Sequence, residues 1–346
     1  MKRIMIIFML CMALGQAEQN RTEENDIFEE THSYVNKKLY TFSHHLDQKL
    51  LSYSDYFWEN NNTVPSAPSD SEPPMDISGW FYGFFEDAMF DEVYTTSYAR
   101  IRTTAQYDHK RNDYDTSVSL RLSLALPKIT KRLNLYIDNV EESLDNRNFN
   151  SDIENSIGLR YRLPSEKYFH SSVSVGLHSL DNPYIRAYLW APFGNEKWRN
   201  RLYQTLKYSH DNEFEDETGL VFDRIMDDNA MLRFQLGRRN SQYLYTVEKG
   251  DFFFGGLSFS KTTKFNRAYK IGTSVVGSYR PDWDASKYTL YGVYKQNIWR
   301  KWLFWEIEPR VEWEKAYDFD PNYVLLFSME IHFGRDFSKR VFDSFH

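Results

Sequence analysis

Apolar and polar residues alternate along most of the chain, and residues 117–138 show the alternation most clearly. In 117–126 the leucines and Val118 take every second position, while serines and Arg121 lie between them. The apolar row resumes at Leu133 after a short break and continues with the same period. A period of two is typical of an extended strand with one apolar face and one polar face. The segment therefore predicts a β-hairpin.

The same period recurs as far as residue 333 and predicts an all-β protein of about fourteen antiparallel strands. The expected strands lie near residues 96–107, 114–126, 132–138, 154–163, 168–180, 184–192, 198–210, 216–225, 230–246, 251–262, 267–279, 285–296, 300–313 and 322–333. Twelve strands are the alternative, because 184–192, 241–262 and 285–296 alternate less clearly. The run of hairpins has no long crossover, which favours an up-and-down barrel over a sandwich.

A helix is expected ahead of the sheet. Apolar residues recur at spacings of three, four and seven between residues 26 and 58, and Asp26 can cap the first turn. The expected organisation is a signal peptide (1–17), the helix with a Pro/Ser/Asn-rich linker (18–75), an aromatic lead-in segment (76–95), the barrel (96–333) and a C-terminal tail (334–346). The helix could plug the lumen, lie on the membrane surface or pair with another helix.

The N-terminus has the pattern of a secretory signal peptide. Lys2 and Arg3 precede an apolar stretch, and a small-x-small cleavage site ends at Ala17. Cleavage there would change the formal net charge from −7 to −9 and would remove Cys11, the single cysteine. The exported chain would then have no disulfide, so its fold would depend on sheet closure or a large core.

Composition narrows the class of protein further. The mean hydropathy is −0.64, yet 17% of the residues are aromatic. Beyond the N-terminus, no segment approaches the roughly 20 apolar residues that a spanning helix needs. The acidic balance also argues against nucleic acid as a partner, since that partner requires a basic surface. A barrel in which only alternate residues are apolar fits both values.

Charged residues in the middle of the expected strands indicate which face meets lipid. Facing the bilayer, each would cost roughly 2–4 kcal/mol at the midplane, whereas a wet lumen can hold them. Aromatic residues expected near strand ends on the apolar face, such as Tyr98, Tyr107 and Trp313, suit a membrane interface. The sequence therefore predicts a transmembrane barrel. The alternative is an exported soluble β protein whose apolar rows pack against each other.

The last expected strand resembles a known class of proteins. In residues 321–333 apolar residues alternate and end at Phe333, as in the closing strand of Gram-negative outer-membrane β-barrel proteins; here residues 334–346 follow. The resemblance implies an outer-membrane location with a periplasmic N-terminus, and outer-membrane lipid and lipopolysaccharide as partners. It also implies that the barrel assembly machinery recognises Ile331 and Phe333.

Charged residues on the polar faces are the candidate functional residues. We expect the lumen to be lined by Arg100, Arg102, Arg160, Arg162, Arg186, Glu306, Glu308, Arg310 and Glu330. Closure would bring the first strand beside the last, and so Arg100 and Arg102 near Glu330. Basic and acidic walls could then oppose each other across a pore, or salt bridges could fill the lumen and stabilise the wall.

Two functions follow from this architecture. The first is a porin-like or gated pore for small polar solutes. The second is a non-conducting structural or interaction barrel whose periplasmic helix, residues 26–58, recruits a protein partner.

Enzymatic and metal chemistry find weaker support in the sequence. His178 shares a polar face with Ser172 and Ser174, but residues two or four apart on one strand are about 7 and 13 Å apart, so a hydrolase would need help from another strand. The acidic stretch 211–217 could bind Ca²⁺ weakly, although a solvated loop is the simpler interpretation. The sequence has no zinc spacing, phosphate loop or dinucleotide fingerprint. We therefore expect no enzyme, no cofactor and no metal site.

Overall fold

The computed structural model describes the predicted sheet and the N-terminal helix. The described residues are 27–57, 97–126, 133–138, 156–163, 169–178, 182–195, 197–210, 213–227, 229–241, 250–263, 267–279, 282–300 and 302–334. The expected signal peptide, linker and aromatic lead-in segment lie outside these residues, as does the tail from residue 335 onward. What the sequence predicts for those segments stays a prediction.

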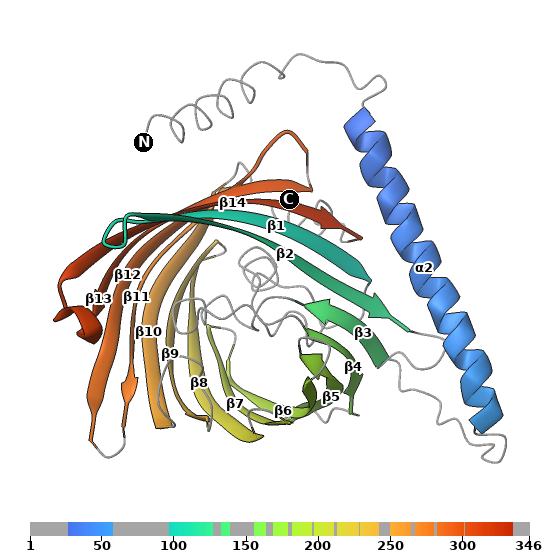
Figure 1. Ribbon diagram of the computed structural model, residues 1–346, viewed down its shortest axis with the longest axis horizontal. Helices are drawn as coiled ribbons and strands as arrows, with labels where there is room; N and C mark the ends of the chain where they lie inside the picture. The colour runs from blue at the N-terminus through green and yellow to red at the C-terminus, as the bar shows by residue number, and fades with distance from the viewer. Residues whose placement is uncertain are drawn as a thin grey trace.

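Fourteen strands form a closed antiparallel barrel in which each strand pairs with its neighbours in sequence and β1 pairs with β14 (Figure 1). The strands are β1 (Tyr98–Asp108), β2 (Asp113–Ala125), β3 (Leu133–Asp138), β4 (Ser156–Arg162), β5 (His170–His178), β6 (Asn182–Gly194), β7 (Trp198–Ser209), β8 (Glu213–Asp227), β9 (Ala230–Ser241), β10 (Gly250–Thr263), β11 (Arg267–Ser278), β12 (Asp284–Asn297), β13 (Leu303–Glu314) and β14 (Pro321–Phe333). The all-β, up-and-down barrel predicted by the alternation is confirmed, with fourteen strands and not twelve.

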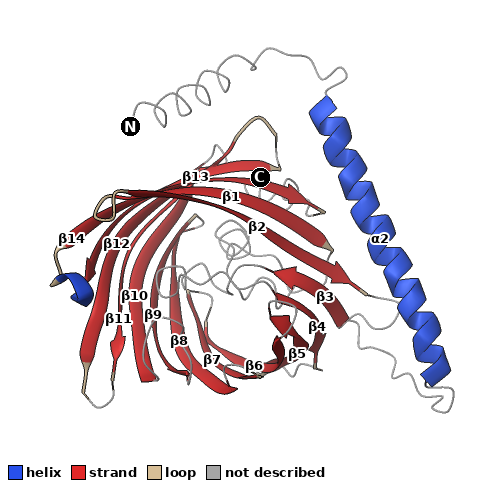
Figure 2. Ribbon diagram, viewed as in Figure 1, coloured by secondary structure: helices blue, strands red, loops and turns tan. Residues whose placement is uncertain are grey.

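The two faces of the sheet differ as the alternation predicts. On β2, Val118 is 65% exposed, whereas its neighbour Ser119 is 7% exposed. The pairing register carries the same parity around the barrel, and exposed apolar side chains such as Val175 on β5 and Ile271 on β11 lie on the same face as Val118. In a closed barrel the exposed face is the outer one. The outer surface of the barrel, whose strands are red in Figure 2, is therefore apolar. Most buried polar side chains of the strands lie on the inner face.

One aromatic residue expected at the outer interface points inward instead. Tyr98 is 6% exposed and shares the face of Arg100, two residues later on β1. Tyr107 does lie on the outer face, where its ring is 4.6 Å from that of Tyr114 on β2. Tyr98 and Tyr107 are nine positions apart, and residues an odd number of positions apart point to opposite faces of a strand. The expectation for Tyr98 is therefore wrong.

Helix α2 (Ile27–Phe57) lies beside the barrel wall and not in the lumen (Figure 1). The His32 ring stacks on Trp302, just before β13, and on Phe333 of β14, with centroids 4.3 and 5.0 Å apart. Ser43 Oγ donates a 2.9 Å hydrogen bond to the carbonyl oxygen of Ala125, at the end of β2. The helix therefore crosses one rim of the barrel at the seam, the place where the first and last strands pair.

The face that α2 turns to the rim includes polar side chains. Ser43 and Asp47 are 6% and 1% exposed, whereas Phe28 and Phe42 of the predicted apolar stripe are 72% and 56% exposed. The stripe therefore coincides with the packing face only in part, because Leu39 and Leu46 are half-buried there while Phe28 and Phe42 are not. Among the described residues, no helix is long and apolar enough to cross a membrane.

Candidate functional site: the inner wall of the barrel

The predicted lumen residues all share the inner face. Arg100 and Arg102 lie on β1, Arg160 and Arg162 on β4, Arg186 on β6, Glu306, Glu308 and Arg310 on β13, and Glu330 on β14. The strand register places each of them on the face of the sheet opposite the exposed apolar rows. They form two groups. One lies on β1, β13 and β14 at the seam, and the other lies on β4 and β6.

The first group centres on Glu330, whose exposed fraction is 0%. Arg102 forms a salt bridge with Glu330 and reaches Glu306 at 2.7 Å. Lys295 of β12 donates a 2.6 Å hydrogen bond to the other oxygen of Glu330, and Arg100 lies 3.8 Å from Glu330. We call these five residues the seam cluster. Charge-assisted hydrogen bonds between such closely packed, buried groups are strong and directional.

Ion pairs continue from the seam cluster along β13 toward the other rim. Arg310 Nε donates to Glu308 at 2.7 Å, and its Nη1 lies 3.8 Å from Glu312. Lys287 of β12 pairs with Glu312 at 3.0 Å and with Glu314 at 3.3 Å. Arg310 and Lys287 therefore each have two carboxylates within salt-bridge distance.

The expected approach of Arg100 and Arg102 to Glu330 is confirmed, but the interpretation that these charges oppose each other across a pore is wrong. The register pairs Arg102 directly with Glu330 on the adjacent strand. Neighbouring strands are about 4.8 Å apart, so these charges lie on one wall and neutralise each other there. At the seam, salt bridges that stabilise the wall are the arrangement observed.

A second set of ion pairs joins β8 to β9. Arg233 donates from Nε and Nη2 to the two carboxylate oxygens of Asp223, at 2.6 and 2.8 Å. Both side chains are at most 3% exposed. Arg239 donates to Glu217 at 2.8 and 2.6 Å, and the Tyr203 hydroxyl donates to the same carboxylate at 2.8 Å. The bidentate Arg233–Asp223 pair, and the two hydrogen bonds from Arg239 to one oxygen of Glu217, fix these side chains against the wall.

The acidic stretch 211–217 is not a solvated loop or a cation site over the residues that the structure describes. Residues 213–217 form the first part of strand β8. They pair with residues 205–209 of β7, and residues 215–217 also pair with residues 239–241 of β9. Glu215 lies 3.2 Å from Lys207, and Asp216 lies 2.7 Å from Arg238. Across the described residues, no group of three or more His, Cys, Asp or Glu side chains is placed to bind a metal ion.

The second group of predicted lumen residues has a different environment. No Asp or Glu occurs within β4, β5, β6 or β7. Arg162 donates to the Asn134 side-chain oxygen at 2.7 Å, and Arg160 lies 3.4 Å from Ser174 Oγ with its guanidinium over the Tyr136 ring. These contacts hold the side chains of Arg160 and Arg162 against the wall.

Large aromatic side chains on the inner face lie against the wall. They cover glycines on neighbouring strands: Tyr136 lies over Gly158, Tyr184 over Gly176, Tyr203 over Gly219, Phe254 over Gly237, and Tyr291 over Gly272. A Cβ on Gly272 would come within 2.6 Å of the Tyr291 hydroxyl oxygen. Glycine at these positions therefore makes room for a ring that lies along the sheet.

The residues considered for hydrolysis form no catalytic group. The His178 ring stacks on Tyr184 of β6, with centroids 4.0 Å apart. Ser174 Oγ accepts from Arg160, and the register places Ser174 beside Arg186. A nucleophilic serine requires a base at hydrogen-bond distance, and His178 lies four residues from Ser174 on the same strand. The geometry therefore offers no Ser–His pair at these positions.

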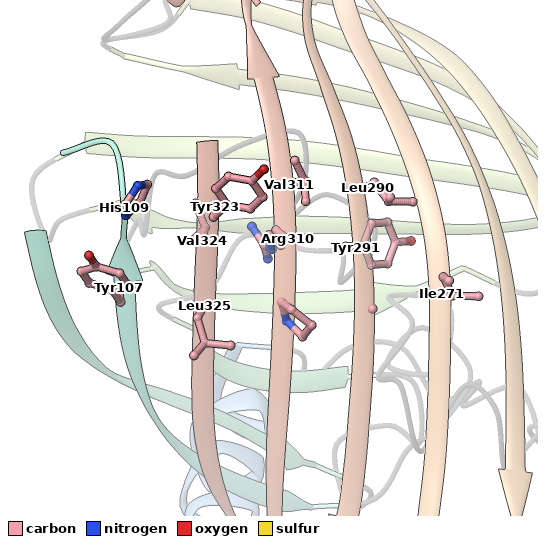
Figure 3. Close-up of a pocket in the computed structure, with 12 residues that line it drawn as sticks. Tyr107, His109, Ile271, Leu290, Tyr291, Arg310, Val311, Tyr323, Val324 and Leu325 are labelled. Atoms are coloured by element: carbon pink, nitrogen blue, oxygen red, sulfur yellow. The ribbon is translucent and has the colours of Figure 1, made fainter. Parts of the chain in front are cut away.

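A groove of about 610 Å³ lies on the outer face where β12 and β13 pair irregularly (Figure 3). The ladder between these strands is interrupted between Tyr291–Arg310 and Tyr294–Ile307. Pro309 has no N–H to donate to the ladder. Gly292 has no side chain, which leaves the sheet surface hollow there. Leu290, Leu325 and other apolar side chains line the groove, which makes it part of the outer surface and not of the inner wall.

Sequence patterns do not single out all of the charged wall residues. Lys295 of the seam cluster lies on β12, where tyrosines occur on both faces and obscure the parity. Asp223 and Lys207 lie in clearer strands, and their partners become evident only from the cross-strand register. A careful count of parity from Tyr208, an exposed residue of β7, would have placed Lys207 on the inner face.

No protein-family model and no curated protein matches the sequence. The chain is similar to solved structures of outer-membrane channels. One is the channel DcaP of Acinetobacter baumannii (9% identity, TM-score 0.45, covering 68% of this chain and 96% of that one). A second is a loop-deletion mutant of OmpT of Vibrio cholerae (7% identity, TM-score 0.44, covering 68% of this chain and 98% of that one). A third is an anion-selective porin from Comamonas acidovorans (9% identity, TM-score 0.43, covering 69% of this chain and 99% of that one).

Proposed function

We propose that this chain forms a porin-like pore for small polar solutes in an outer membrane. One observation carries the proposal: the barrel has fourteen strands, an exposed apolar outer face and a charged inner face. An apolar belt around a polar interior is the arrangement of a membrane barrel that conducts water-soluble molecules.

The same proposal includes the location and the partners of the barrel. The outer rows would contact lipid and lipopolysaccharide, and the rim that carries α2 would face the periplasm. Ile331 and Phe333 would be recognised by the assembly machinery before α2 docks, because the His32 ring stacks on Phe333 in the folded protein. No nucleic acid and no catalytic activity are part of the proposal.

Planar-bilayer recordings test the proposed pore. The purified chain is first shown to be a folded barrel by its heat-modifiable migration on a gel. We then expect steady single-channel conductance, either in the full chain or after deletion of residues 18–75. A folded barrel that conducts in neither form would overturn the proposal.

A second candidate function is supported by the exposed surface of α2. Ile27, Phe28, Tyr34 and Phe42 are between 56% and 75% exposed, although the helix is docked on the rim. Exposed apolar side chains gathered on one element mark interaction surfaces. A non-conducting barrel that recruits a periplasmic protein through α2 is the corresponding proposal. It predicts no conductance, together with partner binding that is lost in Phe28→Ser/Phe42→Ser.

A further inference from the structure

The groove of about 610 Å³ on the outer face runs across the strands (Figure 3). The register pairs Ile271 of β11 with Gly292 of β12, Pro309 of β13 with Leu325 of β14, and Leu325 with Tyr107 of β1. Gly292 and Pro309 form the floor of the groove. A Cβ on Gly292 would be 4.0 Å from its nearest neighbours, the Lys270 carbonyl oxygen and Pro309 Cγ. The space above Gly292 is therefore open.

The two ends of the groove lie in different chemical surroundings. Tyr107, His109 and Tyr323 form one end, at the rim opposite α2, and the His109 ring is 6.5 and 6.2 Å from the rings of the two tyrosines. Each of these side chains has an apolar body and a polar tip, which suits a membrane interface. Ile271, at the other end, lies in the middle of β11 and is 55% exposed. The groove therefore leads from the rim toward the middle of the apolar outer face.

The lining of the groove favours an apolar occupant. Leu290, 45% exposed, and Val311 flank the floor on the side of the rim, and Leu325 lies beside Pro309. Water in such a hollow would lack the two to four polar partners that an ordered water needs. An empty hollow would forfeit dispersion contacts with its lining. On a surface that faces lipid, a flexible acyl chain can supply these contacts.

Two cations lie at the polar end of the groove, in the turn that follows His109. Lys110 Nζ donates a 3.3 Å hydrogen bond to the carbonyl oxygen of Asp320 and lies 3.8 Å from its carboxylate. Arg111, whose side chain is 62% exposed, lies 3.9 Å from the carboxylate of Asp108. Ammonium and guanidinium groups bind phosphate. A lipid phosphate at this rim would share the two cations with their carboxylates.

We infer that the groove binds one acyl chain of lipopolysaccharide and that Lys110 and Arg111 contact a phosphate of its lipid A headgroup. The inference rests on the proposed location of the barrel, in which α2 lies on the periplasmic rim and the groove opens at the external rim. The lipid of that leaflet is lipopolysaccharide. The chain enters at the tyrosines and His109 and ends near Ile271, while the headgroup stays at the rim.

Filling the groove tests the acyl-chain site. The full chain is purified in detergent, lipid A is added, and native mass spectrometry measures how much lipid each folded barrel retains. Wild-type protein should retain one lipid A. Gly292→Leu should retain about tenfold less, the effect of excluding roughly two methylene groups from an apolar site.

The matched control is Gly255→Leu, which should retain lipid A as the wild type does. Gly255 alternates with the exposed Leu257 on the outer face of β10, outside the groove, and a Cβ there would be 3.6 Å from its nearest neighbour. Ile271→Trp narrows the other end of the groove and should lower retention as well, so the test does not depend on one variant.

Two further measurements test the headgroup. Lys110→Gln/Arg111→Gln should lower the retention of lipid A several-fold, because it removes both cations at the polar end. Lys315→Gln is the control at the same rim, since Lys315 pairs with Asp284 outside the groove. In competition, phosphatidylethanolamine at the same concentration should not displace lipid A from the wild type.

The outcomes separate this inference from the pore itself. Equal retention in Gly292→Leu and Gly255→Leu refutes the groove as the lipid site. Displacement of lipid A by phosphatidylethanolamine refutes lipopolysaccharide as the occupant, and full retention in Lys110→Gln/Arg111→Gln refutes the phosphate contact. A wild-type dimer that Gly292→Leu abolishes shows a second copy in the groove and also refutes the inference.

Conductance is the separate readout of the pore. Gly292→Leu should conduct as the wild type does, because the groove lies on the outer face and not in the lumen. A folded wild type that does not conduct refutes the pore, whereas lipid retention still decides the groove.

Discussion

Charged side chains are arranged differently on two sides of the inner wall. At the seam, Glu330 is surrounded by Arg100, Arg102 and Lys295, and its exposed fraction is 0%. On the far side, β4 to β7 contribute cations and no strand carboxylate. Cross-strand pairs of opposite charge stabilise a sheet, and pairs of like charge destabilise it. The salt bridges around Glu330 therefore stabilise the seam, whereas on β6 and β7 the register places Arg186 directly opposite Lys207.

The position of the helix follows the same division. The contacts of α2 with the barrel are at the strand ends of β13, β14, β1 and β2. There Tyr40 donates a 2.7 Å hydrogen bond to the carbonyl oxygen of Gly334, and the amide of Gly334 donates to Asn36 at 2.8 Å. Closing a barrel pairs strands from opposite ends of the chain, which is the contact with the largest loop-closure entropy. Both the ion pairs and the helix reinforce that contact.

The sharpest test of this comparison is Glu330→Gln, for which we expect the largest loss of stability. The variant leaves Arg102 and Lys295 buried beside a neutral amide, and breaking a buried ion network in this way costs about 3–5 kcal/mol. The measurement is the free energy of unfolding in urea, followed by the change in gel migration. The control is Glu314→Gln on the same wall. Its pair with Lys287 is partly exposed, so it should cost under about 1 kcal/mol.

A smaller loss is expected for Asp223→Asn. Asparagine keeps one of the two oxygens that accept hydrogen bonds from Arg233, so one charged hydrogen bond is lost, which costs about 1.5–3 kcal/mol. One cation loses its partner here, compared with several at Glu330. Glu215→Gln, at the partly exposed Lys207 pair, is the matched control in the same urea experiment. Equal losses in the two variants would contradict the role assigned to burial.

The third prediction concerns the helix at the seam. His32→Ala removes two ring stacks and the 2.8 Å hydrogen bond to the carbonyl oxygen of His332. We expect α2 to dock less tightly by about 1–2 kcal/mol, from the aromatic contacts and the hydrogen bond together. Limited proteolysis of α2 in the folded barrel measures this as faster cleavage. Lys37→Ala, on the exposed side of the helix, should cleave at the wild-type rate.

The alternation of residues was enough to predict the barrel and the side of the sheet on which each predicted lumen residue lies. In a strand of period two, one set of alternate residues faces outward and the other inward. A row of leucines such as Leu120 to Leu124 shows which set faces outward. The pattern does not give the register between strands, which depends on turn geometry. It could therefore name Arg102 and Glu330 as neighbours once closure was assumed, but it could not find Lys295 or the Asp223–Arg233 pair.

The helix illustrates a second limit. Apolar spacing predicted α2 itself, but its docking depends on His32, Asn36 and Ser43, which pair with backbone groups at the rim. Backbone donors and acceptors at strand ends are present in any sequence and leave no signal in its composition. Leu39 and Leu46 of the apolar stripe are half-buried on the docking side, but Phe28 and Phe42 face away, so the stripe alone does not give the packing face.

The smallest expected effect has the opposite sign and bears most directly on the comparison. Arg186→Gln removes one member of the like-charge pair with Lys207, so the free energy of unfolding should rise by about 0.2–1 kcal/mol. Raising the salt concentration should shrink this gain, because salt screens the repulsion between the two cations. Urea unfolding at low and high KCl measures both effects, with Tyr188→Phe on the same strand as a control that leaves charge unchanged. A loss of stability in Arg186→Gln would mean that Arg186 supports the wall as the seam residues do, and the two sides of the barrel would then differ only in where their carboxylates lie.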